Sequence, residues 1–167
     1  MKQEEIKLHK KVRRRDVKAL AEWLEDEKVS KYLNEEQDIS DELKKLSSRS
    51  TLPLFTHAFN QDGQFFMISL RQNGPIGFLR LVPKGEGTEM VVVIGEQSQW
   101  GNGYGYAAIR KGLKKAFFQW REEKVLAKID PDNYRSKAVF RKAGFSKEEE
   151  LEEDELFSVS FNEFVSN

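Results

Sequence analysis

The sequence predicts one domain over residues 1–167, with a mixed, mostly antiparallel seven-stranded sheet and helices on both faces, an α/β arrangement of the α+β kind. Two observations carry this prediction. β-rich apolar runs recur along the chain, and an amphipathic helix follows a glycine-rich turn near its middle. No linker or repeat divides the sequence, which therefore predicts the order β-α-α-β-β-β-α-β-α-β-β within a single core.

The N-terminal part is expected to form one strand and two helices. Ile6 and Leu8 alternate as in a strand, and Val12 continues the pattern less regularly. From Asp16 the apolar positions take helical spacing, and an acidic residue there favours a helix start. A second short helix is expected from Ser40. The apolar positions of the two helices are Val17, Leu20, Trp23 and Leu24 in the first, and Leu43 and Leu46 in the second.

An antiparallel meander is expected next. Residues 65–70 and 75–82 are rich in β-forming side chains, and the turn at 71–74 joins them. A second turn, Lys84-Gly85-Glu86-Gly87, leads into a third strand at 89–94. The stretch before the meander, including His57, is expected to be irregular.

The junction after that third strand is the most informative part of the chain. The apolar run from Met90 to Ile94 breaks at Gly95 and leads into Trp100-Gly101-Asn102-Gly103-Tyr104-Gly105. Glycines at alternate positions allow left-handed backbone angles and close approach of a ligand. Because free amides at a helix N-terminus carry partial positive charge, this loop is expected to hold a phosphate or diphosphate. The helix that follows has an apolar stripe about four turns long, made of Tyr106, Ile109, Leu113, Ala116, Phe117 and Trp120.

The C-terminal part is expected to contain a strand, a short helix and two final strands. The strand at 125–129 follows the long helix and should lie parallel to the 89–94 strand. A helix from Ser136 to Lys142 can end at Gly144 in a left-handed conformation. The last two strands flank residues 152–154 and are expected to finish near Phe164.

Composition narrows the functional classes. Basic and acidic residues both number 28, so no global field favours nucleic acid or a membrane surface, and neither partner is expected. The chain has no apolar run near the ~20 residues of a membrane span and no secretion signal at its start, so a cytoplasmic location is expected. With no cysteine and only 2 histidines, a disulfide, a cysteine nucleophile and a metal site are not expected.

Three motifs, in this order and spacing, resemble those of the GNAT superfamily of acetyl-CoA-dependent N-acetyltransferases. They are the glycine loop at 100–105, Asn133-Tyr134-Arg135-Ser136, and Arg141-Lys142-Ala143-Gly144-Phe145. The upstream segments 22–24 and 29–33 look like the branch that contains ribosomal-protein N-terminal and aminoglycoside acetyltransferases. The resemblance covers nearly the whole chain and implies acetyl-CoA as cosubstrate. It implies a small-molecule or peptide amine as acceptor, such as a peptide N-terminus, an aminoglycoside or a polyamine.

The resemblance also implies where the cofactor lies. The acetyl-pantetheine arm would enter a splayed gap between the Val91 and Val125 strands, with the diphosphate on the loop amides of residues 101–106. Pantetheine amides can pair with an open strand edge. The family usually has glutamine or arginine at the first loop position, where this chain has tryptophan. The cofactor-binding residues implied are Val92, Val93, Ile94, Trp100, Gly101, Asn102, Gly103, Tyr104, Gly105, Tyr106, Asn133, Ser136 and Phe140.

Because the chain lacks cysteine, direct attack of the amine on the thioester carbonyl is expected. A backbone N–H in the Val93–Ile94 stretch could stabilise the resulting oxyanion. The amine must react in its neutral form, which calls for a base or a water chain. Glu96 at the end of the strand and Glu89 at its start are the base candidates, although both can equally be ordinary solvated carboxylates.

The departing thiolate gains from a proton donor, and many family members place a tyrosine hydroxyl seven residues after the motif asparagine. This chain has Phe140 there, and a phenyl ring cannot donate. Ser136, one helical turn earlier, is the expected substitute, and Tyr134 is the second choice. A helix-start serine can also serve only to satisfy the backbone.

Several alternatives stay open at the sequence level. The missing tyrosine motivates a non-catalytic CoA-binding regulatory or interaction module, and the glycine loop also fits the front of a dinucleotide fingerprint, G-x-G-x-x-A. The acidic segment from Glu148 to Glu155 can attract a basic acceptor or can be a solvated hairpin. The chain can be a monomer or a homodimer, since its last strands can pair across a two-fold axis.

Overall fold

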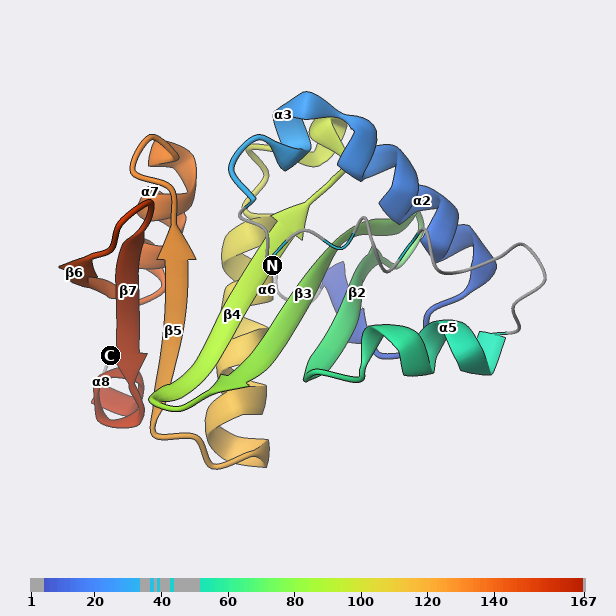
Figure 1. Cartoon of the computed structure of the whole chain (residues 1–167). Coiled ribbons are helices and arrows are strands. Elements are labelled where there is room, and N and C mark those ends of the chain that lie inside the picture. Colours follow the sequence, from blue (N-terminus) through green and yellow to red (C-terminus); the bar gives the residue numbers. More distant parts are fainter. Residues whose placement is uncertain (1–4, 34–36, 38, 40–42, 44–51, 167) are drawn as a thin grey trace.

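A computed structural model describes residues 5–33, 37, 39, 43 and 52–166, and it contains one seven-stranded sheet (Figure 1). The strand order across the sheet is β1-β2-β3-β4-β5-β7-β6. All neighbouring strands are antiparallel except β4 and β5, which are parallel. The mixed, mostly antiparallel sheet predicted from the sequence is therefore confirmed. Its strands are β1 (Ile6–His9), β2 (Gln64–Leu70), β3 (Gly74–Lys84), β4 (Gly87–Ile94), β5 (Lys124–Ile129), β6 (Ser146–Glu150) and β7 (Glu155–Ser160).

Helices cover both faces of the sheet, as expected. Two of them, α2 and α5, lie on one face, while α6 and α7 lie on the other (Figure 1). A π-helical turn through Gln119 extends α6. Within the described part of the chain no helix is long and apolar enough to cross a membrane. The helices are α2 (Arg14–Glu25), α3 (Glu27–Ser30), α5 (Leu52–Phe59), α6 (Tyr104–Lys114), α7 (Tyr134–Lys142) and α8 (Phe161–Ser166).

Three local predictions differ from the structure or cannot be compared with it. The helix expected from Ser40 lies outside the described residues. The irregular stretch expected before the meander contains helix α5 instead. The last strand was expected to finish near Phe164, which is wrong, because β7 ends at Ser160 and α8 follows. A reciprocal cap explains this helix start: the Ser160 N–H donates to Glu163 Oε1 at 2.8 Å, and the Glu163 N–H donates to Ser160 Oγ at 3.0 Å.

The alternation of side chains along β4 connects two apolar cores. Met90, Val92 and Ile94 belong to the core under α6, and Val91 and Val93 belong to the core under α2 and α5. β4 is thus packed on both faces, as its uninterrupted apolar sequence requires. In the described part of the chain these helices cover both faces of β4 and β3 pairs with one edge, so a ligand can reach the strand at its other edge.

Substitution of Phe65 tests the core under α2 and α5. Its ring is fully buried and lies 4.8 Å from the Phe59 ring and 5.4 Å from the Phe78 ring. Phe65→Ala should lower the free energy of unfolding by about 3–5 kcal/mol, because it leaves a cavity between rigid strands. Phe118 is 55% exposed, so Phe118→Ala is the matched control and should lower the free energy of unfolding much less. Chemical denaturation measures both, and equal losses would contradict this packing.

Candidate active site

Strands β4 and β5 are paired over a short distance only. Thr88 is paired with Val125 and Glu89 with Leu126, and the parallel pairing ends there. Beyond this point β4 stays paired with β3, and β5 stays paired with β7. Each strand follows its outer neighbour, so the two diverge toward their C-terminal ends (Figure 1). This divergence of residues 90–94 from residues 127–129, hereafter the split, is the one expected from the sequence.

The backbone groups along the split follow from the pairing of β4 with β3. The Gly95 N–H donates to the Ile76 carbonyl at 2.7 Å, so Gly95 faces β3. Because alternate residues of an antiparallel strand bond the same neighbour, Val93 also faces β3, and the peptide groups of Val92 and Ile94 face the split. Of the three residues expected to pair with pantetheine, these two have the backbone orientation that such pairing requires.

The glycine loop has the conformation that its sequence predicts. Gly101 and Gly103 have φ angles of 81° and 83°, in the left-handed region, and Asn102 lies between them. Gly103 caps the start of α6, where the first helical bond runs from the Ala107 N–H to the Gly103 carbonyl at 3.0 Å. The amides of residues 104–106 therefore precede the helical ladder and are the donors expected at a helix N-terminus. Loop and helix start together form a site suited to a phosphate group.

Trp100 connects the loop to the end of β4. Its indole Nε1 donates to the Ile94 carbonyl at 2.7 Å, so this carbonyl already has a partner at the open end of the split. The Arg135 guanidinium lies 4.4 Å from the Trp100 ring centre, which adds a cation–π contact from α7. Trp100 and Arg135 thus join the segment after β4 to the helix after β5. The tryptophan that replaces the usual family residue has a structural role in the loop.

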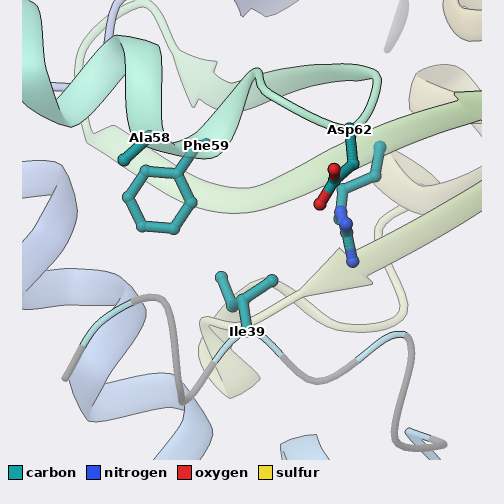
Figure 2. A pocket seen from close by; sticks show the side chains of 5 residues that line it. Ile39, Ala58, Phe59 and Asp62 are labelled. Carbon is teal, nitrogen blue, oxygen red and sulfur yellow. The ribbon is translucent and has the colours of Figure 1, made fainter. Parts of the chain in front are cut away.

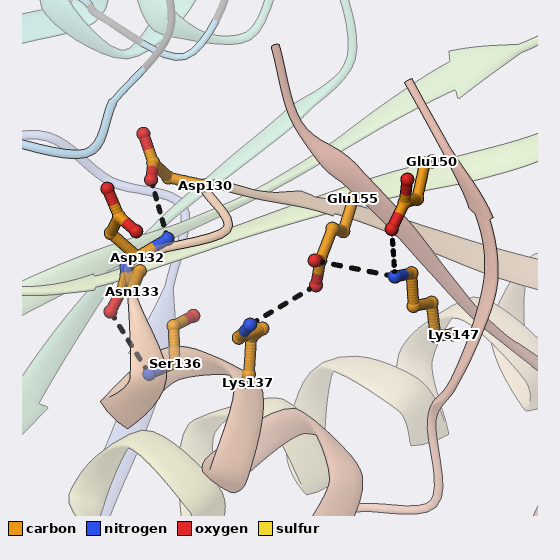
Figure 3. Close-up of polar contacts among 8 residues, drawn as sticks. All are labelled: Asp130, Asp132, Asn133, Ser136, Lys137, Lys147, Glu150 and Glu155. Carbon is orange, nitrogen blue, oxygen red and sulfur yellow. Dashed lines mark hydrogen bonds and ion pairs between the residues drawn. The ribbon is translucent and has the colours of Figure 1, made fainter. Parts of the chain in front are cut away.

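The motif asparagine begins α7. Asn133 Oδ1 accepts the Ser136 N–H at 3.1 Å, as an N-cap residue does (Figure 3). Ser136 is half-buried in the first turn of the helix, whereas Tyr134 is 72% exposed. Of the two expected proton donors, Ser136 is the better shielded from solvent.

Ion pairs tie α7 to the last hairpin. Glu155 lies 3.3 Å from Lys137 of α7 and 3.4 Å from Lys147 of β6, and Lys147 also bonds Glu150 (Figure 3). The hydrogen bond to Glu150 raises the pKa of Lys147 above its usual range, because it favours the charged ammonium. Glu148 likewise pairs with Lys124. Several carboxylates of the acidic segment therefore have structural partners.

Phe140, which occupies the position of the family's usual tyrosine, is a core residue. Its side chain is 5% exposed, and its ring packs edge-to-face on Phe145 with 4.9 Å between ring centres. The contact contributes packing at the helix end. A hydroxyl donor is absent from this position, as the sequence predicted.

Glu89 lies at the closed end of the split and is buried, with 3% exposure. Its Oε1 is 3.7 Å from Lys84 Nζ and 4.0 Å from Lys128 Nζ. Its Oε2 is buried without a hydrogen-bond partner. Burial of an ionisable group with an oxygen that accepts no hydrogen bond lowers the stability of the folded state. Such groups are concentrated at functional sites.

Glu96 has a different environment at the open end of the split. Its Oε1 accepts the Trp23 Nε1–H of α2 at 2.8 Å, and the side chain is half-buried. Sequence reasoning assigned Trp23 to core packing and missed this bond, because the two residues are 73 positions apart. The two base candidates therefore lie at opposite ends of β4.

Two hollows in the described part of the chain are lined by residues other than those of the split and the glycine loop. One is lined by Ile39, Ala58, Phe59, Asp62 and Arg80 (Figure 2), and the other by Gly144, Asn162, Glu163 and Ser166. None of the predicted site residues lines either hollow. Among the described residues no group of three or more histidine, aspartate or glutamate side chains could hold a metal ion. The candidate site is therefore defined by the split and the glycine loop.

Comparison with known proteins agrees with this geometry. Residues 8–146 match the family model of the acetyltransferase (GNAT) domain. A spermidine N-acetyltransferase from Vibrio cholerae, solved with CoA and spermine, superposes with a TM-score of 0.76 at 16% identity, over 97% of this chain and 99% of that chain. A GNAT-family acetyltransferase from Bacillus anthracis gives a TM-score of 0.70 at 20% identity, over 93% and 95% of the two chains.

A domain from Methanocaldococcus jannaschii gives a TM-score of 0.72 at 19% identity, over 93% of this chain and 98% of that chain. At these identities the superpositions show that the fold is shared. A comparison with curated protein sequences gives no match.

Substitution of Gly103 tests the phosphate site. Its φ of 83° is unfavourable for a residue with a Cβ, so Gly103→Ala should distort the start of α6. The dissociation constant for acetyl-CoA should rise about tenfold by titration calorimetry, since strain of roughly 1–2 kcal/mol corresponds to that change. Gly85→Ala is the control, because an added Cβ there meets no atom within 4 Å. Unchanged affinity in the Gly103 variant would exclude this loop as the anion site.

Proposed function

The chain belongs to the GNAT acetyltransferase family, an acetyl-CoA-dependent enzyme family, and we propose that it transfers the acetyl group directly to a primary amine within a ternary complex. The observation that carries the proposal is the split beside the glycine loop. It combines an open strand edge with a phosphate site at one end of the sheet.

The residues on both sides of the split fit acetyl-CoA. Amides of residues 101–106 would bind the diphosphate, since left-handed glycines leave them accessible. The peptide groups of Val92 and Ile94 would pair with the amides of the pantetheine arm, as a peptide pairs with an open strand edge. When bound, the cofactor supplies the thioester carbonyl as acetyl donor. Because Trp100 occupies the Ile94 carbonyl, the Ile94 N–H and both groups of Val92 would remain for that arm.

The absence of cysteine supports the proposed direct transfer. The chain has no cysteine, so no thioester can form on a cysteine of the protein. An incoming amine is protonated at neutral pH and must lose a proton before it can act as a nucleophile. A carboxylate near the reacting amine is the simplest acceptor for that proton.

Glu89 suits this role better than Glu96. It is buried at the closed end of the split and has an oxygen without a hydrogen-bond partner, whereas the Glu96 carboxylate accepts an indole N–H. Lys84 Nζ and Lys128 Nζ both lie within 4.0 Å of Oε1, so the oxygen that would accept the proton is Oε2, which has no hydrogen-bond partner. We therefore assign the general base to Glu89.

Ser136 is the hydroxyl that we assign as hydrogen-bond donor to the leaving thiolate, which it would stabilise while keeping its own proton. It is half-buried at the N-terminus of α7, where the positive end of the helix dipole favours a nearby anion. Tyr134 is the less suitable candidate because its side chain is 72% exposed to solvent.

The acceptor is proposed only as a class. The Vibrio cholerae relative was solved with spermine, which is a polyamine, and polyamines are among the acceptors expected from the sequence. Peptide N-termini and aminoglycosides remain in the same proposal, together with the ribosomal-protein and aminoglycoside branch that the sequence resembles.

Binding and turnover can be measured separately. Acetyl-CoA should raise the melting temperature, because a ligand that binds only the folded state stabilises it. Free CoA thiol should then appear with at least one amine from a panel of polyamines, aminoglycosides and peptides. A thermal shift without thiol release from any amine would instead support a non-catalytic CoA-binding module.

The roles assigned to Glu89 and Ser136 can be tested with one variant of each residue. Glu89→Gln should lower kcat at least about 100-fold, because the amide cannot accept the proton. Ser136→Ala should lower kcat about tenfold at saturating acetyl-CoA. Glu123 is an exposed carboxylate just before β5, so Glu123→Gln is the control and should keep normal turnover. Wild-type kcat in either assigned variant, with the protein folded by circular dichroism, would refute that residue's role.

A further inference from the structure

Glu96 has no role in the proposed reaction, although its position in the split is well defined. It follows Gly95 directly after β4, so it lies at the open end of the split. Its neighbour Gly95 belongs to the face under α2, because Trp23 packs against it there. The Glu96 carboxylate accepts a hydrogen bond from Trp23 of α2, so it lies on the face opposite α6, whereas the phosphate site lies at the start of α6.

Trp23 fixes the carboxylate in a defined orientation. The indole is 4% exposed, and its Nε1–H donates to Glu96 Oε1 at 2.8 Å. A Cβ on Gly95 would lie 2.1 Å from Trp23 Cδ2, so only glycine permits this close contact between ring and backbone. The ring therefore positions both the end of β4 and the side chain that follows it.

A second contact holds the same segment. The Gln97 side-chain amide donates to Asp26 Oδ2, at the corner between α2 and α3. Asp26 also accepts the Lys28 N–H at 3.0 Å, which begins α3. Glu96 is therefore bound to α2 and Gln97 to the corner that follows it, so the position of Glu96 is preorganised.

The charge of Glu96 is not compensated. Among residues 5–33, 37, 39, 43 and 52–166, no cationic side chain pairs with it within 4.0 Å, whereas Glu89 has two lysines at that range. The indole N–H is a neutral donor, so it orients the carboxylate without neutralising it. A half-buried, oriented carboxylate without a cationic partner among these residues favours a cationic ligand.

We propose that Glu96 binds a second ammonium group of the acceptor, so that amines with two or more positive charges are the preferred substrates. The inference rests on the proposed amine acetylation. Glu96 lies two to four residues beyond the Val92–Ile94 edge, which is on the order of 7–13 Å at the rise of a strand. A flexible acceptor of that length can present one neutral amine to the thioester and one charged amine to Glu96.

The test compares acceptors that differ only in their second charge. Diaminooctane and octylamine have the same chain length, and spermidine and neomycin represent a natural polyamine and an aminoglycoside. In the wild type, KM for diaminooctane should be at least about tenfold lower than for octylamine, the usual scale of a charge-assisted contact. Glu96→Gln should reduce this ratio toward one, while Glu123→Gln should preserve it. A KM ratio near one in the wild type, or an unchanged ratio in Glu96→Gln, would overturn the inference.

A binding measurement gives the same answer without turnover. Calorimetric titration of diaminooctane into the CoA-saturated protein should show binding that weakens about tenfold in Glu96→Gln. Absence of diaminooctane binding to the wild type would overturn the role of Glu96, even if another amine is acetylated. Absence of acetyl-CoA binding would instead refute the proposed function. If Glu96→Gln weakens the binding of spermidine but not of neomycin, the preferred acceptor is a linear polyamine.

The Trp23→Phe variant tests the orientation of the Glu96 carboxylate separately from its charge. Phenylalanine keeps an aromatic ring over Gly95 and loses the N–H donor, so the carboxylate keeps its charge but not its fixed position. KM for diaminooctane should rise several-fold in this variant with kcat retained, and KM for acetyl-CoA should stay constant. A parallel rise in KM for octylamine would show a purely structural role for Trp23 and contradict its assignment as a positioning residue.

Discussion

The parallel pairing of β4 with β5 stops after two residue pairs, and the rest of the site depends on that stop. Each strand remains paired with its outer neighbour, β3 or β7, over the residues where the two central strands separate. Peptide groups that would pair within a continuous sheet are therefore available to a ligand. Because α2, α5 and α6 cover the two faces of β4, its edge is the part of the strand that a cofactor can reach.

The same strand places two carboxylates with different chemistry at its two ends. Glu89 at the closed end is buried beside lysines, and Glu96 at the open end is half-buried against a tryptophan. Burial and partners, rather than residue type, separate a group suited to accept a proton from one suited to bind a cation. In the proposed reaction, proton transfer and acceptor recognition would thus be divided along a single strand.

Much of this arrangement could be predicted from the sequence, because local signals were strong. The seven strands, the glycine loop with its left-handed residues and the helix after it follow from apolar periodicity and glycine spacing. Helix α8 was missed although Ser160 and Glu163 form a capping box, since the apolar residues around them also suit a strand. Helix α5 was missed although Pro53 lies in its first turn, where proline is favoured.

The contacts of Glu96 and the burial of Glu89 could not be predicted in this way. The Trp23–Glu96 bond joins residues 73 positions apart, and the two lysines beside Glu89 come from β3 and β5. Such contacts depend on how the strands and helices pack. The helical spacing of apolar residues predicted that Trp23 lies in the core, but it could not show that the indole N–H would donate to Glu96.

A crystal structure with CoA bound tests the central claim most directly. The account predicts the diphosphate within hydrogen-bond distance of the amides of residues 101–106, and pantetheine amides paired with Val92 and Ile94 on the open edge of β4. The nucleotide bound elsewhere, or β4 and β5 paired along their full length, would contradict it.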